Sequence, residues 1–334
     1  MNKVMNKYYT ILICILAFCC WQCNDEDSNV GPSGEDKNWY IVYPSDDPLD
    51  GLIYKVYENH HVPVFYNDTI GREKKVDRFG QEWVSYEILD PNYTIESVMA
   101  SVKYVLSRDR EKLKTGVEFL CDGVLERLPG IIQPKCFLLV DSVYLRGAGS
   151  VSWNINWIPG TMYRGAGCTV IGIDTLSKMS EDEKLALTYN IVGEEFGAYL
   201  RYNYADTLNA FYRYSNNSVL TGSAYGVRIS NYDSEAVGDA YWKEFGFLNC
   251  SYGTFSYWDL PEDFPAAMPD FYSYLTSSQQ EDVRDFVVAI LTMTDEQFEE
   301  ENGMYPVVMH KYEVLKRIVF HQRCGYDLPA GRSS

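Results

Sequence analysis

The chain has 334 residues, of which 46% are hydrophobic and 23% are charged, a balance that is typical of a folded globular protein with a large core. Its formal net charge is −18 at pH 7, which argues against nucleic acid as a partner, because proteins that bind the phosphate backbone concentrate lysine and arginine. Beyond the first residues, no run is long and apolar enough to span a bilayer. Any attachment to a membrane is therefore expected at the N-terminus.

Residues 1–22 have the layout of a secretory signal peptide. Two lysines precede a short apolar run at 11–18. The stretch 23–37 then opens with Cys23 and continues as NDEDSNVGPSGEDK, which is acidic and has almost nothing to bury. We expect the signal to be removed and 23–37 to form a flexible tether in front of a single folded domain at 38–334.

Cys23 is the expected site of lipidation. Its position directly after the apolar run resembles the bacterial lipoprotein pattern, and the acids behind it resemble the surface-export signal of Bacteroidetes lipoproteins. This resemblance implies an outer-membrane lipoprotein exposed at the cell surface. Gln22 is bulkier than the small residue usually found before a lipidated cysteine, which leaves Cys19 and Cys20 open as acceptors. A cleaved signal and a soluble secreted protein is the alternative.

Five cysteines follow the anchor, and they are scattered and odd in number. This pattern predicts no disulfide framework, and the lack of C-x-x-C spacing argues against a thiolate zinc site. We expect most of them to be small buried apolar residues. They are Cys121, Cys136, Cys168, Cys250 and Cys324.

The remaining pattern predicts one α+β unit. Residues 38–44 and 60–68 are β-like and are separated by a turn-rich connection that opens with SDDPLDG. Two helices follow, at 95–106 with Thr94 as its cap and at 108–128 with Ser107 as its cap. Apolar strands are expected at 135–145 and 168–176, with a loop containing strand fragments at 147–160 between them.

A further helix is predicted to begin after Ser180. This serine and Glu183 form the S-x-x-E capping-box pattern. Apolar residues then recur at alternating spacings of four and three, which predicts an amphipathic helix. They are Leu185, Tyr189, Val192, Phe196 and Tyr199.

The middle of this helix reads EEFGA at 194–198. In a zinc protease with the pattern H-E-x-x-H, two histidines one helical turn apart hold the metal and the glutamate acts on its bound water. Here Glu194 and Ala198 occupy the histidine positions, on one face of the helix, and Glu195 occupies the position of the glutamate. Alanine offers no donor atom, and one carboxylate is a poor substitute for two imidazoles around zinc.

Residues 50–328 resemble the zinc-metallohydrolase-like lipoproteins, zincins of the H-E-x-x-H type, that Bacteroidetes encode beside nutrient importers. The resemblance includes IYKVYENHHVPVFYND, FLLVDSV, TVIGIDTLSKMSEDEK and GFLNCSYGTFSYWDLPEDFPAAM. It implies a zincin-like α+β domain in which an acidic third ligand follows the helix, a position that EDFPA fills with Ala266. With Glu194, Ala198 and Ala266 in the ligand positions, we expect no zinc, no other cofactor and no peptidase activity. Glu195 is then a vestigial general base.

Aromatic residues around the motif form a candidate ligand site. Aromatic faces beside carboxylates suit peptides or glycans, although the same rings also fill ordinary cores. The candidate residues are Tyr241, Trp242, Tyr257, Trp258 and Glu262. The company of the resembling family implies an accessory role beside an outer-membrane importer.

Two alternatives stay open. The chain could be an active hydrolase, either metallopeptidase-like or one that uses Glu195 and Glu262 as paired carboxylates, which requires a defined separation between them. It could instead be a structural subunit of an importer complex, which a large flat apolar surface would indicate.

The four histidines are expected to have structural roles. As strand residues, His60 and His61 would point to opposite sides of a sheet. A helix that opens with Pro306 would place His310 and His321 on one face, with Arg317 between them disfavouring a cation. No metal site is predicted elsewhere.

Overall fold

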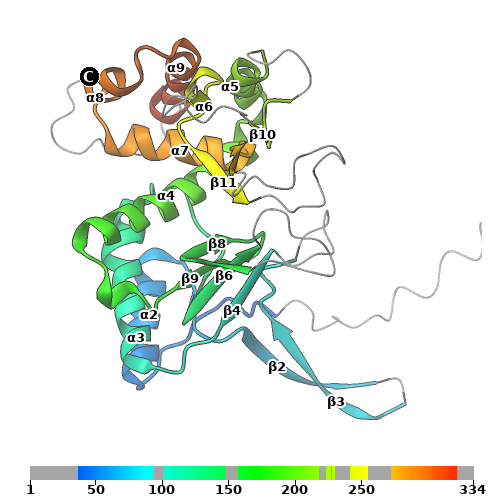
Figure 1. Cartoon of the computed structure of the whole chain (residues 1–334). Helices are drawn as coiled ribbons and strands as arrows, with labels where there is room; N and C mark the ends of the chain where they lie inside the picture. Colours follow the sequence, from blue (N-terminus) through cyan, green and yellow to red (C-terminus); the bar gives the residue numbers. More distant parts are fainter. Residues whose placement is uncertain are drawn as a thin grey trace, which may run out of the picture. The chain divides into compact units, whose positions relative to one another are not determined.

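The computed structural model describes residues 37–77, 79–93, 101–146, 157–217, 223–226, 228–229, 241–254 and 272–321, with the backbone alone at 228–229, 241, 251–254, 272–275 and 321. The chain divides into two compact units, Met1–Ile41 and Val42–Ser334. In the first unit, the ammonium of Lys37 lies 3.9 Å from the ring centre of Trp39. In the second, a mixed four-stranded sheet, several small sheets and a helical C-terminal part form an α+β fold (Figure 1). Among the described helices, none is long and apolar enough to cross a membrane.

The four-stranded sheet has the strand order β1-β5-β9-β8. Its first three strands are parallel, and the last pairs antiparallel with β9. Every residue of β5 and β9 is buried, as expected for strands covered on both faces. The strand predicted at 168–176 is confirmed as β9. The run at 135–145, predicted as one strand, divides into β5 and, in another sheet, β6 at Ser142–Arg146. The bounds are Val64–Phe65 for β1, Phe137–Val140 for β5, Thr169–Gly172 for β9 and Met162–Arg164 for β8.

The second unit also contains two three-stranded antiparallel sheets. One has the order β4-β6-β7, with β4 at Val102–Val105, β6 at Ser142–Arg146 and β7 at Trp157–Gly160. The other has the order β10-β12-β11, with β10 at Arg228–Ile229, β12 at Tyr272–Thr276 and β11 at Cys250–Thr254.

The helix predicted at 95–106 is wrong in its described part, because residues 102–105 form strand β4. The side chain of Asn92 fixes the start of this strand: its Oδ1 accepts from the amides of Ser101 and Val102 at 2.8 and 2.9 Å. The β-branched Val102 and Val105 also favour the extended conformation. Thr94, the predicted cap, lies outside the described residues.

A two-stranded hairpin joins β2 at Thr69–Val76 to β3 at Glu82–Ile88. No other described strand pairs with either of them. Several of its large apolar side chains are exposed, among them Val76, Trp83 and Tyr86.

Helix α2, at Pro48–His60, replaces the predicted connection. Asp47 accepts hydrogen bonds from the amides of Leu49 and Asp50 at 3.0 and 3.1 Å, so the acid before Pro48 is a helix N-cap rather than part of a turn. The β-like stretch predicted at 38–44 forms no strand.

His60 and His61 are likewise not strand residues. His60 ends α2, and His61 caps that helix with a φ of 58°, in the left-handed region. The Nε2 atom of His60 lies 4.0 Å from Sγ of Cys121.

The helix predicted at 108–128 is confirmed, with a change of cap and of type. Helix α3 runs from Arg110 to Glu118 and is capped by Asp109, which accepts from two amides, instead of by Ser107. It continues as a π-helical segment at Phe119–Val124 and a 3-10 turn at Leu125–Arg127.

The C-terminal part is helical. Helix α4 is the predicted helix, with the Ser180–Glu183 capping box formed as expected, and α9 opens at Pro306 as predicted. The serine-glutamate box recurs at Ser278 and Glu281 before α7. The bounds are Glu181–Asn203 for α4, Ala205–Asn217 for α5, Tyr241–Glu244 for α6, Gln279–Thr292 for α7, Asp295–Asn302 for α8 and Pro306–His321 for α9.

The middle of α4 is buried on every side, which differs from the predicted amphipathic helix. Residues 191–197 are all buried, while Leu185 on the predicted apolar face is 42% exposed. Two glycines allow α7 to pack closely along α4. A Cβ added to Gly193 would lie 2.6 Å from Cγ2 of Val288, and one added to Gly197 would lie 3.5 Å from Cγ1 of Val283. The motif positions therefore lie between the sheet and α7.

Candidate functional site

Glu195 faces the four-stranded sheet. Its Oε1 accepts a hydrogen bond from the Thr169 hydroxyl of β9 at 2.5 Å, and its Oε2 accepts from Nε of Arg164 in β8 at 3.1 Å. The glutamate side chain is 3% exposed and that of the arginine is 27% exposed. The position that resembles a general base is thus occupied by a buried carboxylate paired with a cation.

Glu194 points the other way, toward α7. Its Oε1 accepts from Nη1 of Arg284 at 3.2 Å, and its Oε2 accepts from Nε2 of Gln280 at 2.9 Å. Arg284 also donates to Oδ1 of Asp285 from Nε, at 2.9 Å. Burial opposes the charge of this arginine, but Asp285 and Glu194 together raise its pKa above the ordinary value.

These contacts do not fit a zinc site. Each of the four carboxylate oxygens of Glu194 and Glu195 already accepts a hydrogen bond, and two of the donors are arginines. Zinc binds donors with free lone pairs, and a nearby guanidinium repels a divalent cation. Ala198 is half-buried on the same helix and has no donor atom. The third ligand position, Ala266, lies outside the described residues.

A third arginine lies near Glu194 and Glu195. Arg201 of α4 donates to the Gln280 carbonyl at 3.5 Å. Burial lowers its pKa, and the negative charge of Glu194 offsets only part of that effect. The carboxylates of α4 thus lie among cationic side chains from three elements, β8, α4 and α7.

Within the described ranges, no group of three or more His, Cys, Asp or Glu side chains could hold a metal ion. His310 stacks on Tyr214, with ring centres 5.2 Å apart and an interplanar angle of 4°. The side chain of His321 is not described.

The predicted ligand-binding residues are only partly described. Trp242 is half-buried, and its indole N–H donates to the Leu248 carbonyl at 3.1 Å. For Tyr241 the backbone is described, as the first residue of α6. Tyr257, Trp258 and Glu262 lie outside the described residues, as does the lipidation site Cys23. The ligand site therefore stays a prediction.

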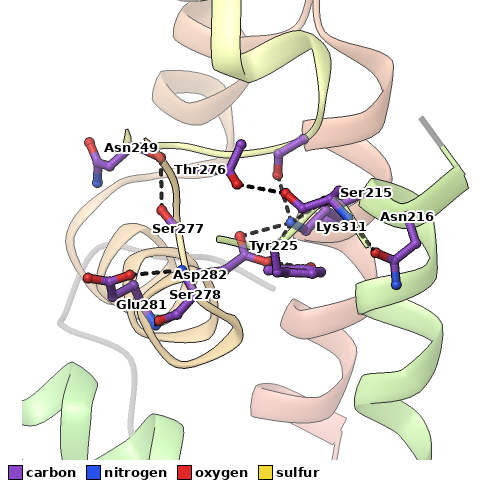
Figure 2. Close-up of polar contacts among 12 residues, drawn as sticks. Ser215, Asn216, Tyr225, Asn249, Thr276, Ser277, Ser278, Glu281, Asp282 and Lys311 are labelled. Carbon is purple, nitrogen blue, oxygen red and sulfur yellow. Dashed lines mark hydrogen bonds and ion pairs between the residues drawn. The ribbon is translucent and has the colours of Figure 1, made fainter. Parts of the chain in front are cut away.

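A second polar cluster, which the sequence analysis missed, lies inside the helical part (Figure 2). Nζ of Lys311 in α9 contacts both carboxylate oxygens of Asp282 in α7, at 2.8 and 2.6 Å. It also donates to the Ser215 hydroxyl at 2.8 Å and to the Gly246 carbonyl at 2.7 Å. The Tyr225 hydroxyl donates to Oδ2 of Asp282 at 2.8 Å.

This Lys311 cluster is enclosed by aromatic rings. The ammonium lies 4.5 Å from the ring centre of Phe211, 4.8 Å from that of Phe247 and 5.0 Å from that of Phe286. Lys311 and Ser215 are fully buried, and Asp282 is 1% exposed. A Ser–Lys pair at this distance resembles a catalytic pair, but both side chains are fully buried, so we interpret the cluster as structural.

Burial changes the proton affinity of both partners. It raises the pKa of Asp282 to about 6, although Lys311 and Tyr225 act against that rise. It also lowers the pKa of Lys311, which Asp282 opposes. The sequence did contain a signal for this cluster, because Lys311 falls on the apolar stripe of α9 that Val308, Leu315 and Ile318 define.

A surface hollow of about 340 Å³ lies between α3, the π-helical segment and the start of α4. None of the predicted site residues lines it. Its walls include Thr115, Phe119, Asp122, Arg127, Leu185 and Thr188.

No protein-family model matches the chain, and no curated protein or solved structure matches it either. The described residues form an α+β arrangement, and a zincin-like domain remains an expectation from the sequence resemblance.

Proposed function

We propose that this protein is a non-catalytic, surface-exposed outer-membrane lipoprotein whose zincin-like domain binds a peptide or glycan beside a nutrient importer. The observation that carries the non-catalytic part is the pairing of Glu195 with Arg164 and Thr169. A general base must lie within hydrogen-bond reach of the water that it deprotonates, so water must have access to it. Both oxygens of Glu195 are instead engaged by donors, in a site that is almost closed to solvent.

The environment of Glu194 supports the same proposal. Its partners on α7, Arg284 and Gln280, occupy the side of the helix where a zincin would hold its metal. A cation there would have to displace a guanidinium from a buried ion pair, which removes a compensated charge from the interior. The pairing of Glu194 with Arg284 therefore supports a domain that holds no metal at this position.

The binding role rests on the sequence. An acidic tether behind Cys23 would place the domain outside the membrane, and the aromatic residues at 241–242 and 257–258 supply the faces that peptides and sugars bind. The carboxylate of Glu262 adds a hydrogen-bond acceptor for sugar hydroxyls or peptide amides.

Metal analysis tests the non-catalytic proposal first. The full chain, purified in detergent, is dialysed against zinc and measured by elemental analysis and calorimetry. We expect no stoichiometric zinc and no peptidase activity above that of Glu195→Gln. One tight zinc per chain, or activity that Glu195→Gln abolishes, would overturn the proposal.

Binding and anchoring need separate tests. Screening against arrays of glycans and peptides should give a ligand whose affinity falls at least tenfold in Trp258→Ala and is unchanged in Tyr202→Ala, a control at an exposed ring on α4. Metabolic labelling with an alkyne fatty acid should mark the wild type and not Cys23→Ser. Label that persists in Cys23→Ser would indicate that the lipid is attached to Cys19 or Cys20 instead.

A further inference from the structure

Cys136 and Cys168 occupy matching positions on two neighbouring strands. Parallel pairing sets Phe137 opposite Thr169, and the Thr169 amide donates to the Cys136 carbonyl at 3.1 Å. The two cysteines are one residue earlier in each strand, so they face each other on the same side of the sheet. Neighbouring strands lie about 4.8 Å apart, which falls inside the Cα separation that a disulfide spans.

Both thiols are buried inside the protein. Cys136 is 1% exposed and Cys168 is 4% exposed. A hydrogen bond with the Cys136 thiol, together with burial, raises the pKa of Cys168 far above its ordinary value. The Cys136 thiol also donates to the Gly167 carbonyl at 3.4 Å. The two cysteines are therefore neighbours in the sheet register, and both are shielded from water.

The other described cysteines, Cys121 and Cys250, are less buried than Cys136 and Cys168. Burial is the largest cause of the rise in the pKa of both thiols. The nearest polar contact of Cys121 is a histidine ring. They provide matched controls for any chemistry at the Cys136–Cys168 pair.

We propose that Cys136 and Cys168 become joined by a disulfide when the chain folds under oxidising conditions. The thiolate of one cysteine attacks the disulfide of an oxidant, either glutathione disulfide or a protein thiol–disulfide oxidoreductase, and forms a mixed disulfide. The second thiolate attacks the cysteine sulfur of that mixed disulfide and forms the intramolecular bond. The oxidant leaves as its reduced thiols, which take up the two protons, so two electrons pass from the cysteines to the oxidant.

The bond would fasten β5 to β9 directly before Thr169, the residue whose hydroxyl holds Glu195. It would close the segment 136–168 and restrict the unfolded chain. Because both thiols are buried in the folded protein, an oxidant reaches them only before or during folding. This inference is independent of the proposed function, since it concerns the sheet and requires no ligand.

Refolding of the full chain tests the proposal. The protein is refolded with glutathione disulfide or with excess reductant, free thiols are blocked with iodoacetamide, and tryptic peptides are measured by mass spectrometry without reduction. We expect a linked peptide pair containing Cys136 and Cys168 only after oxidative refolding. From the length of the closed loop, the oxidised protein should melt on the order of 5 °C higher than the reduced protein.

The controls separate this bond from other oxidation. Cys121→Ser and Cys250→Ser should keep the linked peptides and the shift in melting temperature. Cys136→Ala and the double variant Cys136→Ala/Cys168→Ala should lose both, and the double variant should melt with the reduced wild type, which shows that it still folds. Two alkylated cysteines at 136 and 168 after oxidative refolding, or a linked pair that uses Cys121 or Cys250, would overturn the proposal.

Discussion

Replacing Lys311 by methionine is the most direct test of how the helical part is held together. Methionine keeps a long unbranched side chain and removes the charge. The Asp282 carboxylate is 1% exposed. It then has the Tyr225 hydroxyl at 2.8 Å as a donor and, among the described residues, no cation beside it. Leaving one charge of a buried pair uncompensated costs about 3–5 kcal/mol. Asp282→Leu should cost a similar amount, because it leaves the ammonium of Lys311 buried among aromatic rings.

The double variant Lys311→Met/Asp282→Leu separates the energetic contribution of the ion pair from that of the surrounding packing. With both charges gone, the remaining cost comes from lost hydrogen bonds and amounts to about 1–3 kcal/mol. The Ser215 hydroxyl and the Gly246 carbonyl lose the Lys311 donor, and the Tyr225 hydroxyl loses the Asp282 acceptor. The free-energy cost of the double change should therefore be smaller than the summed costs of the two single changes by at least ~2 kcal/mol. Urea unfolding, read as the midpoint at constant slope, measures each free energy of unfolding.

The pH dependence gives an independent check. The folded-state pKa of Asp282 lies above its ordinary value, so its contribution to stability is complete below the ordinary pKa of 3.8 and is lost as the pH rises through about 6. Without Lys311 this rise in pKa is larger. The stability gap between Lys311→Met and the wild type should shrink between about pH 8 and about pH 5. Additive single costs together with a gap that is constant over pH would refute the reasoning.

Three further predictions concern α4. Arg164→Met should lower the free energy of unfolding by about 2–4 kcal/mol, because it leaves Glu195 buried without its cation, and Arg164→Met/Glu195→Met should recover part of that loss in urea unfolding. Gly193→Ala should cost about 1–3 kcal/mol, since its new methyl would meet Val288, whereas Gly130→Ala, with open space around it, should stay within about 0.5 kcal/mol of the wild type; equal effects would contradict the close-packing argument. The Ser180 amide and hydroxyl lower the pKa of Glu183, so the capping box stabilises the fold above the ordinary pKa of 4.5 and loses that contribution as the pH falls through the lowered value. Melting temperatures of Glu183→Gln and the wild type should accordingly differ at neutral pH and converge in acid.

Local signals account for the elements that the sequence predicts well. Strands β5 and β9 are continuous apolar runs, and α4 and α9 begin at a capping box and a proline, so their cues lie within a few residues. The prediction of a turn-rich connection that opens with SDDPLDG is wrong, because an acid followed by proline marks both turns and helix starts, and here it starts α2. The prediction of a helix at 102–105 is wrong because the pairing with β6, forty residues later, decides the outcome.

At the candidate site, too, local cues are readable from the sequence and distant contacts are not. The positions Glu194, Glu195 and Ala198 follow from the sequence, but their partners do not. Arg164 precedes Glu195 by 31 residues, and Arg284 follows Glu194 by 90. Only the packing of β8 and α7 against α4 brings these charges together, and no pattern within α4 specifies it.

The close packing of α4 on α7 also limits which side chains and ligands can fit beside Glu194 and Ala198. A Cβ at Gly193 would already touch Val288, so α7 occupies the space beside the helix where an imidazole, a metal and its water would need to fit. Substituting histidines at 194 and 198 would consequently not rebuild a metal centre, because α7 would first have to move outward and Arg284 would lose its buried partner. A metal centre at this position would thus require several coordinated changes in two helices. A substitution confined to α4 would remove a buried ion pair without making room for a metal.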